Sequence, residues 1–208
     1  MESKKMKRNT VKLLAAILAG GLLVGALPAQ DQKAPQKIPF FVYKDANAME
    51  NHYIPSGFIG DYSSVQMNVS CTETPKEGKT CLKFNYTAKP TQGMKWAGVY
   101  FQNPANNWGT QDGGYDITGA KKLKFAARGD KGGEIVEFKM GGINGTAYSD
   151  SDGASSGPIT LTKEWKEFEI DLQGHDLSYI IGGFVWAARA EDNPDGAVFY
   201  LDEIAYVN

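Results

Sequence analysis

The sequence has few of the residues on which most catalytic sites depend. Of its 208 residues, only two are cysteine and two are histidine, His52 and His175. Neither histidine belongs to an HExxH motif or a paired metal-ligand spacing, and no GxSxG motif occurs. Glycine pairs are present, but none lies between a strand and a helix as a phosphate-binding loop requires. These absences give no support to metallohydrolase, serine hydrolase or nucleotide-binding classes.

Long hydrophobic runs are also scarce. The one such run, residues 13–27, is about 15 residues long, fewer than the roughly 20 that span a bilayer. Ala29 follows it as a plausible cleavage point, and a basic region precedes it. That region contains Lys4, Lys5, Lys7, Arg8 and Lys12. We therefore predict that residues 1–29 are a signal peptide, that the mature chain has no membrane span, and that it is secreted or periplasmic.

A concentration of positive charge is missing from the remainder of the chain. Residues 30–208 carry 17 Lys and Arg against 23 Asp and Glu, and the basic residues do not cluster. Nucleic acids and anionic membrane surfaces bind basic surfaces. The acidic composition therefore predicts that neither of them is a partner.

Helical periodicity is absent as well, and short strand-like segments take its place. In one of them Leu82, Phe84 and Tyr86 alternate with Lys83 and Asn85, which is the period of a half-buried strand. The pattern predicts an all-β fold, an antiparallel β-sandwich of the jelly-roll type, over residues 39–208, with 30–38 as a flexible lead-in and 141–158 as a mobile loop. The predicted strands are 65–71, 81–86, 97–102, 122–128, 135–140, 165–172, 183–188 and 198–206.

The two cysteines flank a turn-rich segment, 72–80, that has strand-like sequence on either side. Cys71 and Cys81 can therefore face each other across an antiparallel hairpin. In an oxidising compartment we predict a disulfide between them, and the alternative is a pair of buried thiols.

The most distinctive segment, 96–109, holds two tryptophans, a tyrosine, a phenylalanine and four side-chain amides. Apolar rings beside amide donors and acceptors suit a ligand with apolar C–H faces and a rim of hydroxyls, as in a sugar. If the strand turns Phe101 toward a core, then Trp96, Tyr100 and Gln102 point outward. Trp108 follows in a loop. The alternative is that these rings pack between two sheets.

Three further segments resemble the galactose-binding-domain-like jelly rolls, which include many carbohydrate-binding modules of extracellular glycan-active proteins. They are GGYDITGAKKLKFAARG at 113–129, KEWKEFEIDL at 163–172 and FYLDEI at 199–204. The resemblance covers about residues 40–206 and implies the fold. It also implies binding of sugar on a sheet face or at its edge loops, without indicating which sugar.

The candidate carbohydrate-binding residues share an aromatic ring or a polar group on a predicted outward position or loop. Trp186 shares a strand face with Phe184, so a core position is the alternative for it. Lys139 lies on a non-core face, for which simple solvation is the alternative. The full candidate set is Trp96, Tyr100, Gln102, Trp108, Lys139 and Trp186.

A structural calcium ion is implied by the resemblance, because such jelly rolls often hold one between the first strand and the last. The matching positions are Asp45 and Asp202. Calcium takes six to eight oxygen ligands, many of them backbone carbonyls that a sequence does not reveal. The acidic run at 150–153 lacks the spacing of a calcium loop, so it is predicted to be a solvated turn.

A glycoside hydrolase requires two well-placed carboxylates. Glu169 and Asp171 resemble the start of the catalytic strand motif of a jelly-roll hydrolase family, but Gln173 and Gly174 stand where that motif needs a further glutamate. The sequence therefore predicts an exported, non-catalytic module that binds carbohydrate. The alternatives are a protein-interaction or scaffold module of a cell-envelope or secretion system, with a protein partner in the envelope, and a small glycoside hydrolase.

Overall fold

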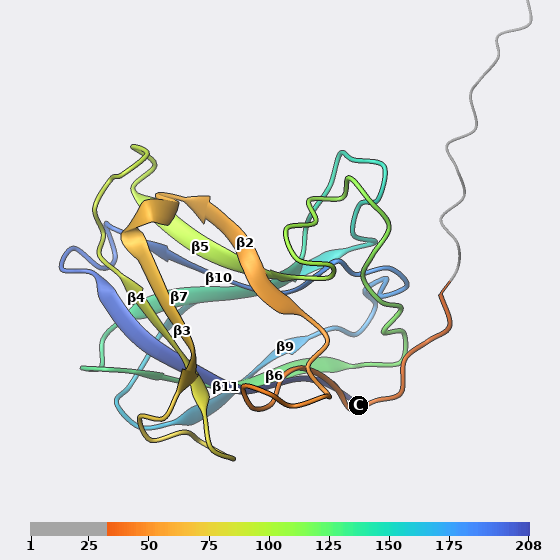
Figure 1. Cartoon of the computed structure of the whole chain (residues 1–208), viewed down its shortest axis with the longest axis horizontal. Coiled ribbons are helices and arrows are strands. Elements are labelled where there is room, and N and C mark those ends of the chain that lie inside the picture. The colour runs from red at the N-terminus through yellow and green to blue at the C-terminus, as the bar shows by residue number, and fades with distance from the viewer. Residues whose placement is uncertain (1–32) are drawn as a thin grey trace, which may run out of the picture.

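The computed structural model describes residues 33–208, which form two antiparallel β-sheets packed face to face (Figure 1). The predicted all-β sandwich is confirmed. The predicted signal peptide lies outside the described residues. The strands are β1 Phe40–Tyr43, β2 Ile54–Gly60, β3 Val65–Cys71, β4 Cys81–Tyr86, β5 Trp96–Gln102, β6 Lys122–Gly129, β7 Ile135–Gly141, β8 Gly153–Thr160, β9 Lys166–Asp171, β10 Gly182–Arg189 and β11 Ala197–Val207.

The six-stranded sheet is organised around β11, which is 11 residues long. Its strand order is β3-β4-β11-β6-β9, and β1 also pairs with β11. On one edge of β11, the first half pairs with β4 and the second half with β1. On the other edge β6 pairs with both halves, across a bulge between Asp202 and Ala205.

The five-stranded sheet has the order β2-β5-β10-β7-β8, with β5 and β10 at its centre. Both strands bury every second side chain against the other sheet, including Val99 and Phe101 of β5 and Phe184 of β10. Within residues 33–208 there is no helix long and apolar enough to cross a membrane.

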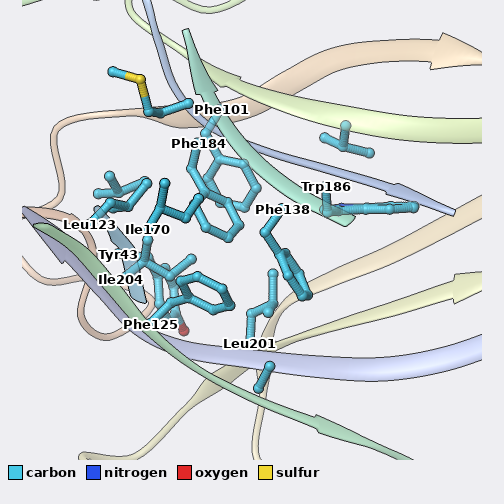
Figure 2. Packing of buried hydrophobic residues seen from close by; sticks show 14 of the residues in the cluster. Tyr43, Phe101, Leu123, Phe125, Phe138, Ile170, Phe184, Trp186, Leu201 and Ile204 are labelled. Carbon is cyan, nitrogen blue, oxygen red and sulfur yellow. The ribbon is translucent and has the colours of Figure 1, made fainter. Parts of the chain in front are cut away.

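The core between the sheets is built largely of aromatic rings (Figure 2). Phe138 and Phe184 stack with their centroids 5.8 Å apart, and Phe125 contacts Phe138 at 4.7 Å. The Trp186 ring contacts Phe84 and Phe199 at 5.1 and 5.0 Å. Aromatic side chains bury large apolar areas, so this cluster supplies much of the hydrophobic stabilisation that positions both sheets.

The sequence prediction missed three strands. The segment 141–158 was predicted to be a mobile loop, but residues 153–158 belong to β8, which pairs with β7. β8 has the sequence GASSGPIT, and as an edge strand it buries few side chains, so its hydrophobic alternation is weak. Strands β1 and β2 were missed because β1 is short and β2 is interrupted by Pro55 and Gly57.

The outer face of the six-stranded sheet is partly covered by the segment 72–80, here called the strap. The Tyr200 hydroxyl of β11 donates to the Glu73 carboxylate at 2.8 Å, and the Trp165 indole N–H donates to the Thr74 carbonyl at 2.8 Å. The Arg128 guanidinium stacks 3.6 Å from the centroid of the Tyr200 ring. The strap thus covers the part of this face around Tyr200 and Trp165.

Cys71 and Cys81 stand at the base of the strap as directly paired residues of β3 and β4. The structure has both as buried thiols without a disulfide, so the predicted bond stays a prediction. Burial and the neighbouring Cys71 raise the pKa of the Cys81 thiol.

We expect a Cys71–Cys81 disulfide in protein produced in an oxidising compartment. It closes the strap loop and contributes about 2–4 kcal/mol to the free energy of unfolding. Thiol alkylation followed by peptide mass mapping detects the bond, and a reductant should lower the unfolding midpoint. The double variant Cys71→Ser/Cys81→Ser is the control and should be insensitive to the reductant. Full alkylation of both thiols without prior reduction would contradict the prediction.

Candidate functional site

The outer face of the five-stranded sheet carries the rings of Trp96 and Tyr100. Their neighbours on β5, Ala97, Val99 and Phe101, are completely buried in the core. Because successive strand residues point to opposite faces, Trp96 and Tyr100 project outward, as predicted, and both are partly exposed.

Ile59 of β2, Val185 and Ala187 form the floor of a groove between the two rings, and the Ile59 side chain covers Gly98. Gly98 of β5 is paired with Ala187 of β10, and Tyr100 is paired with Val185. The groove has a volume of about 610 Å³. Its lining includes Trp96, Tyr100, Val185 and Ala187. A flat apolar floor with a ring at each side offers extended contact to the C–H face of a ligand.

Charged groups from β7 line one side of this groove. Val185 is paired with Lys139, and Ala187 with Glu137. The Lys139 ammonium lies 3.1 Å from the Glu137 carboxylate, and the two side chains are 40% and 19% exposed. Burial alone would raise the pKa of Glu137. The hydrogen bonds from Ser155 and Lys139 have the larger combined effect, so the pKa of Glu137 is lower than usual. Glu137 is therefore an ionised acceptor beside a cationic donor, a combination that binds hydroxyl groups.

Glycines support both rings from below. A Cβ atom placed on Gly182 of β10 would lie 3.1 Å from the Tyr100 ring, and one on Gly60 would lie 2.9 Å from the Trp96 ring. Gly60 also has a φ of +67°, which side chains rarely adopt. Each ring therefore packs directly against backbone, and only its remaining surface is open to a ligand.

The loop after β5 folds back over the end of that strand and brings Trp108 next to Tyr100. Their ring centroids are 5.5 Å apart, with an interplanar angle of 69°. Gln102, predicted to bind sugar, is completely buried. Its amide N–H donates to the Asn107 carbonyl at 2.8 Å, and its amide oxygen accepts from Ser56. Gln102 therefore anchors the loop and is not available to a ligand.

The prediction that Trp186 binds sugar is also wrong. Its ring is fully buried in the core between Phe84 and Phe199, on the inner face of β10 (Figure 2). The sequence indicated only that Trp186 and Phe184 share one face of the strand. The structure places both rings in the core. The outward residues of β10 in the groove are Val185, Ala187 and Arg189.

Two aspartates fix the loops at the ends of the groove. Asp61 is completely buried, and its carboxylate accepts from the backbone N–H groups of Gln92, Met94 and Lys95 at 2.6, 3.1 and 2.6 Å. Burial alone would raise the pKa of Asp61. The hydrogen bonds from the backbone have the larger combined effect, so the pKa of Asp61 is lower than usual. The loop that leads into Trp96 is thereby held by one ionised carboxylate.

Asp150 has the same role near Tyr100. Its carboxylate accepts from the backbone N–H groups of Ile143, Ile181 and Gly182, and burial raises its pKa. The prediction of a solvated turn at 150–153 is therefore wrong for Asp150. Sequence alone did not reveal Asp61 or Asp150, because their partners are backbone groups distant in the sequence.

The predicted calcium positions, Asp45 and Asp202, lie beside a second groove of about 640 Å³ on the outer face of the six-stranded sheet. Asp202 is completely buried, and its carboxylate accepts from the backbone N–H groups of Lys76, Glu77 and Glu203. Burial raises its pKa to about 6, with a contribution from Asp45. Within residues 33–208, no group of three or more His, Cys, Asp or Glu is arranged to hold a metal ion.

Several carboxylates nevertheless lie near one another around Asp202. Burial raises the pKa of Glu203, and the charges of Asp202, Glu77 and Asp45 raise it further, so four carboxylates repel one another. Carboxylates are preferred calcium ligands, but the Asp202 Oδ2 atom already accepts from both Lys76 and Glu77. The predicted calcium ion at Asp45 and Asp202 therefore stays a prediction.

The two carboxylates of the hydrolase-like segment, Glu169 and Asp171, lie on β9 and line neither groove. Glu169 is exposed and forms an ion pair with Lys122 at 2.8 Å. Asp171 accepts from the backbone N–H of Gln173 at 3.0 Å. Neither faces the Trp96–Tyr100 groove, and their contacts are those of a solvated sheet face.

No protein-family model matches the sequence, and no curated protein matches it. The fold is similar to solved carbohydrate-binding modules. One, of family 30, is 16% identical, with 83% of this chain and 88% of that chain covered and a TM-score of 0.55. Another, a family 11 module of a cellulosomal cellulase of Clostridium thermocellum, is 13% identical, with 85% and 95% covered and a TM-score of 0.54. A family 30 module from a cellulase of the same organism is 17% identical, with 81% and 96% covered and a TM-score of 0.53. The predicted resemblance is confirmed for the fold.

The different positions of Trp186 and Trp96 predict different effects on stability. Trp186→Ala leaves a cavity among core rings and should reduce the free energy of unfolding by about 3–5 kcal/mol. Trp96→Ala removes a partly exposed ring and should cost about 1 kcal/mol or less. Urea unfolding followed by circular dichroism measures both. Equal losses for the two variants would show that Trp96 is part of the core.

Proposed function

We propose that this protein is an exported, non-catalytic module that binds carbohydrate in the Trp96–Tyr100 groove. The observation that carries the proposal is the pair of outward aromatic rings on β5, separated by an apolar floor that includes Ile59, Val185 and Ala187. A pyranose ring has an apolar C–H face that can stack on each aromatic ring.

The polar side of the groove complements this stacking. The Lys139 ammonium and the Glu137 carboxylate supply one donor and one acceptor, and their ion pair holds them in place. Adjacent hydroxyls of a sugar present both donors and acceptors, so a paired cation and anion can engage them together. Of the predicted sugar-binding residues, the structure thus gathers Trp96, Tyr100 and Lys139 in the groove, with Trp108 beside it.

The similar solved structures support this assignment at the level of the fold. The family 11 and family 30 modules named above are described as carbohydrate-binding modules of cellulases. Folds host many functions, so the ligand of this chain has to be argued from its own groove. That groove offers rings, a flat floor and hydroxyl-binding groups.

A structural calcium ion at Asp45 and Asp202 is a second part of the proposal, and it is tested separately. When bound, it would neutralise the cluster of carboxylates. It would also fix the strap to β11 through Asp202, which already accepts from the backbone of Lys76 and Glu77. Its role would be structural, because the groove with Trp96 lies on the other sheet.

A protein-interaction module is the second candidate. It is favoured by apolar side chains on two of the edge strands, Ile54 of β2 and Val69 of β3, which are 51% and 40% exposed. Unpaired strand edges with apolar side chains can pair with another chain.

Retention on polysaccharide tests the carbohydrate proposal. In native affinity gels that contain mixed-linkage β-glucan, glucomannan or xylan, the wild-type protein should be retarded by at least one polymer. Trp96→Ala and Tyr100→Ala should each weaken binding about fivefold or more, because one stacked ring contributes on the order of 1 kcal/mol.

Trp165→Ala is the matched control, since Trp165 lies under the strap on the other sheet. It should keep the wild-type retardation. A wild-type protein that no polymer retards, together with specific capture of an envelope protein, would favour the interaction module instead.

The pH dependence of stability tests the calcium ion. Without calcium, the pKa of Asp202 is about 6 in the folded state against 3.8 for an ordinary Asp, so the folded state binds the proton more tightly. Stability from this group should therefore rise as the pH falls from above 6 toward 4. Bound calcium favours the ionised carboxylate and should reverse that trend.

The measurement is the unfolding midpoint at pH 7 and pH 5, with calcium or with a chelator, for the wild type and Asp202→Asn. Calcium should raise the wild-type midpoint at pH 7 and leave the variant unchanged. Identical wild-type midpoints with calcium and with chelator would remove the ion from the proposal.

A further inference from the structure

We propose that the groove binds the end of a glycan chain rather than an internal segment. This inference rests on the proposed function, and it concerns which part of the carbohydrate the groove accepts. It follows from the different structures at the two ends of the groove.

The direction of the ligand is set by the two rings. Trp96 and Tyr100 belong to the same strand and are four residues apart, which corresponds to about 13 Å along β5. This distance is longer than one pyranose ring. A ligand stacked on both rings is therefore an oligosaccharide whose long axis follows β5, with Lys139 and Glu137 beside it.

The end of the groove at Tyr100 is closed. After β5, the loop 103–109 turns back over the strand, where the Asn107 carbonyl accepts from buried Gln102 and the Asn106 N–H donates to Ser56 of β2 at 2.9 Å. The Trp108 ring stands at 69° to the Tyr100 ring. A sugar stacked on Tyr100 therefore meets Trp108 as a wall.

A second loop supports this wall. The Tyr148 N–H donates to the Gly109 carbonyl at 3.0 Å, which joins the loop 142–152 to the loop 103–109. Figure 1 shows these two loops standing together beyond one end of the five-stranded sheet. Asp150 ties the second loop to the start of β10 through Ile181 and Gly182. The wall is thus braced on both sides.

The opposite end, beyond Trp96, is open. The groove is bordered there by Met94, Arg189 and Glu191. Met94 is 51% exposed, and the side chains of Arg189 and Glu191 are 59% and 73% exposed. These are flexible side chains in solvent, and a glycan chain can leave the groove between them. A terminal sugar fits against Trp108 while the chain continues past Trp96, whereas an internal sugar at Tyr100 would have its second linkage blocked.

The test compares long and short chains of the same polysaccharide. Mixed-linkage β-glucan, glucomannan and xylan are each used intact and after partial hydrolysis, at equal mass, in titration calorimetry with the wild-type protein. For any polymer that binds, the number of sites per gram should rise in proportion to the number of chain ends. An equal number of sites per gram at both lengths would overturn the inference and leave the proposed function intact.

A variant that lacks the Trp108 ring tests whether that ring closes the groove. Trp108→Ala should lose the dependence on chain length and should gain sites per gram on the intact polymer, because internal segments can then enter. Trp165→Ala should keep the wild-type dependence. If Trp108→Ala retains that dependence, Trp108 is not the wall and the inference fails. If the wild type binds none of the three polymers at either length, the proposed function itself fails, and the inference fails with it.

Discussion

The hydrogen bond from a backbone N–H to an aspartate carboxylate is the interaction on which the functional faces depend. Asp61, Asp150 and Asp202 each accept three such bonds, and at least two of the three come from segments distant in the sequence. A carboxylate removed from water needs hydrogen-bond donors, and the backbone N–H groups of the loops need an acceptor. The aspartate and the loop therefore satisfy each other's hydrogen-bonding groups. The result is that irregular segments between strands have fixed positions, although they contribute little to the hydrophobic core. Both ends of the groove and the strap on the opposite sheet are held in this way.

The two sheets of the sandwich have different exteriors. On the six-stranded sheet the strap covers Tyr200, whose ring is also stacked by Arg128. On the five-stranded sheet the side chains of Ile59, Val185 and Ala187 form the floor of the groove, and the rings of Trp96 and Tyr100 lie beside it. The same fold therefore presents two different outer surfaces. The difference comes from the outward side chains of each sheet and from the loop that crosses one of them.

Local alternation was enough to predict most strands and the outward direction of Trp96, Tyr100 and Lys139. It failed for β8, because an edge strand with few buried side chains has little alternation to detect. It also failed for Gln102, whose outward position is covered by a loop that returns over the strand end. The alternation placed Trp186 and Phe184 on one face, but it could not say which face packs on the other sheet. The braces Asp61 and Asp150 depend on backbone partners distant in the sequence, and such pairings carry no pattern in a single sequence.

The position of β11 at the centre of its sheet affects how the chain reaches its folded state. β11 is the last strand, yet β1, β4 and β6 all depend on it for their main-chain hydrogen bonds. Phe40 is paired with Tyr206, so the first and last strands must meet before the sheet is complete. Contacts so distant in the sequence form slowly, because a long loop must close first. A growing chain therefore has no finished six-stranded sheet until its final strand is available. This delay is compatible with the export proposed for this protein, because a chain that stays unfolded until β11 is available can cross a membrane in extended form.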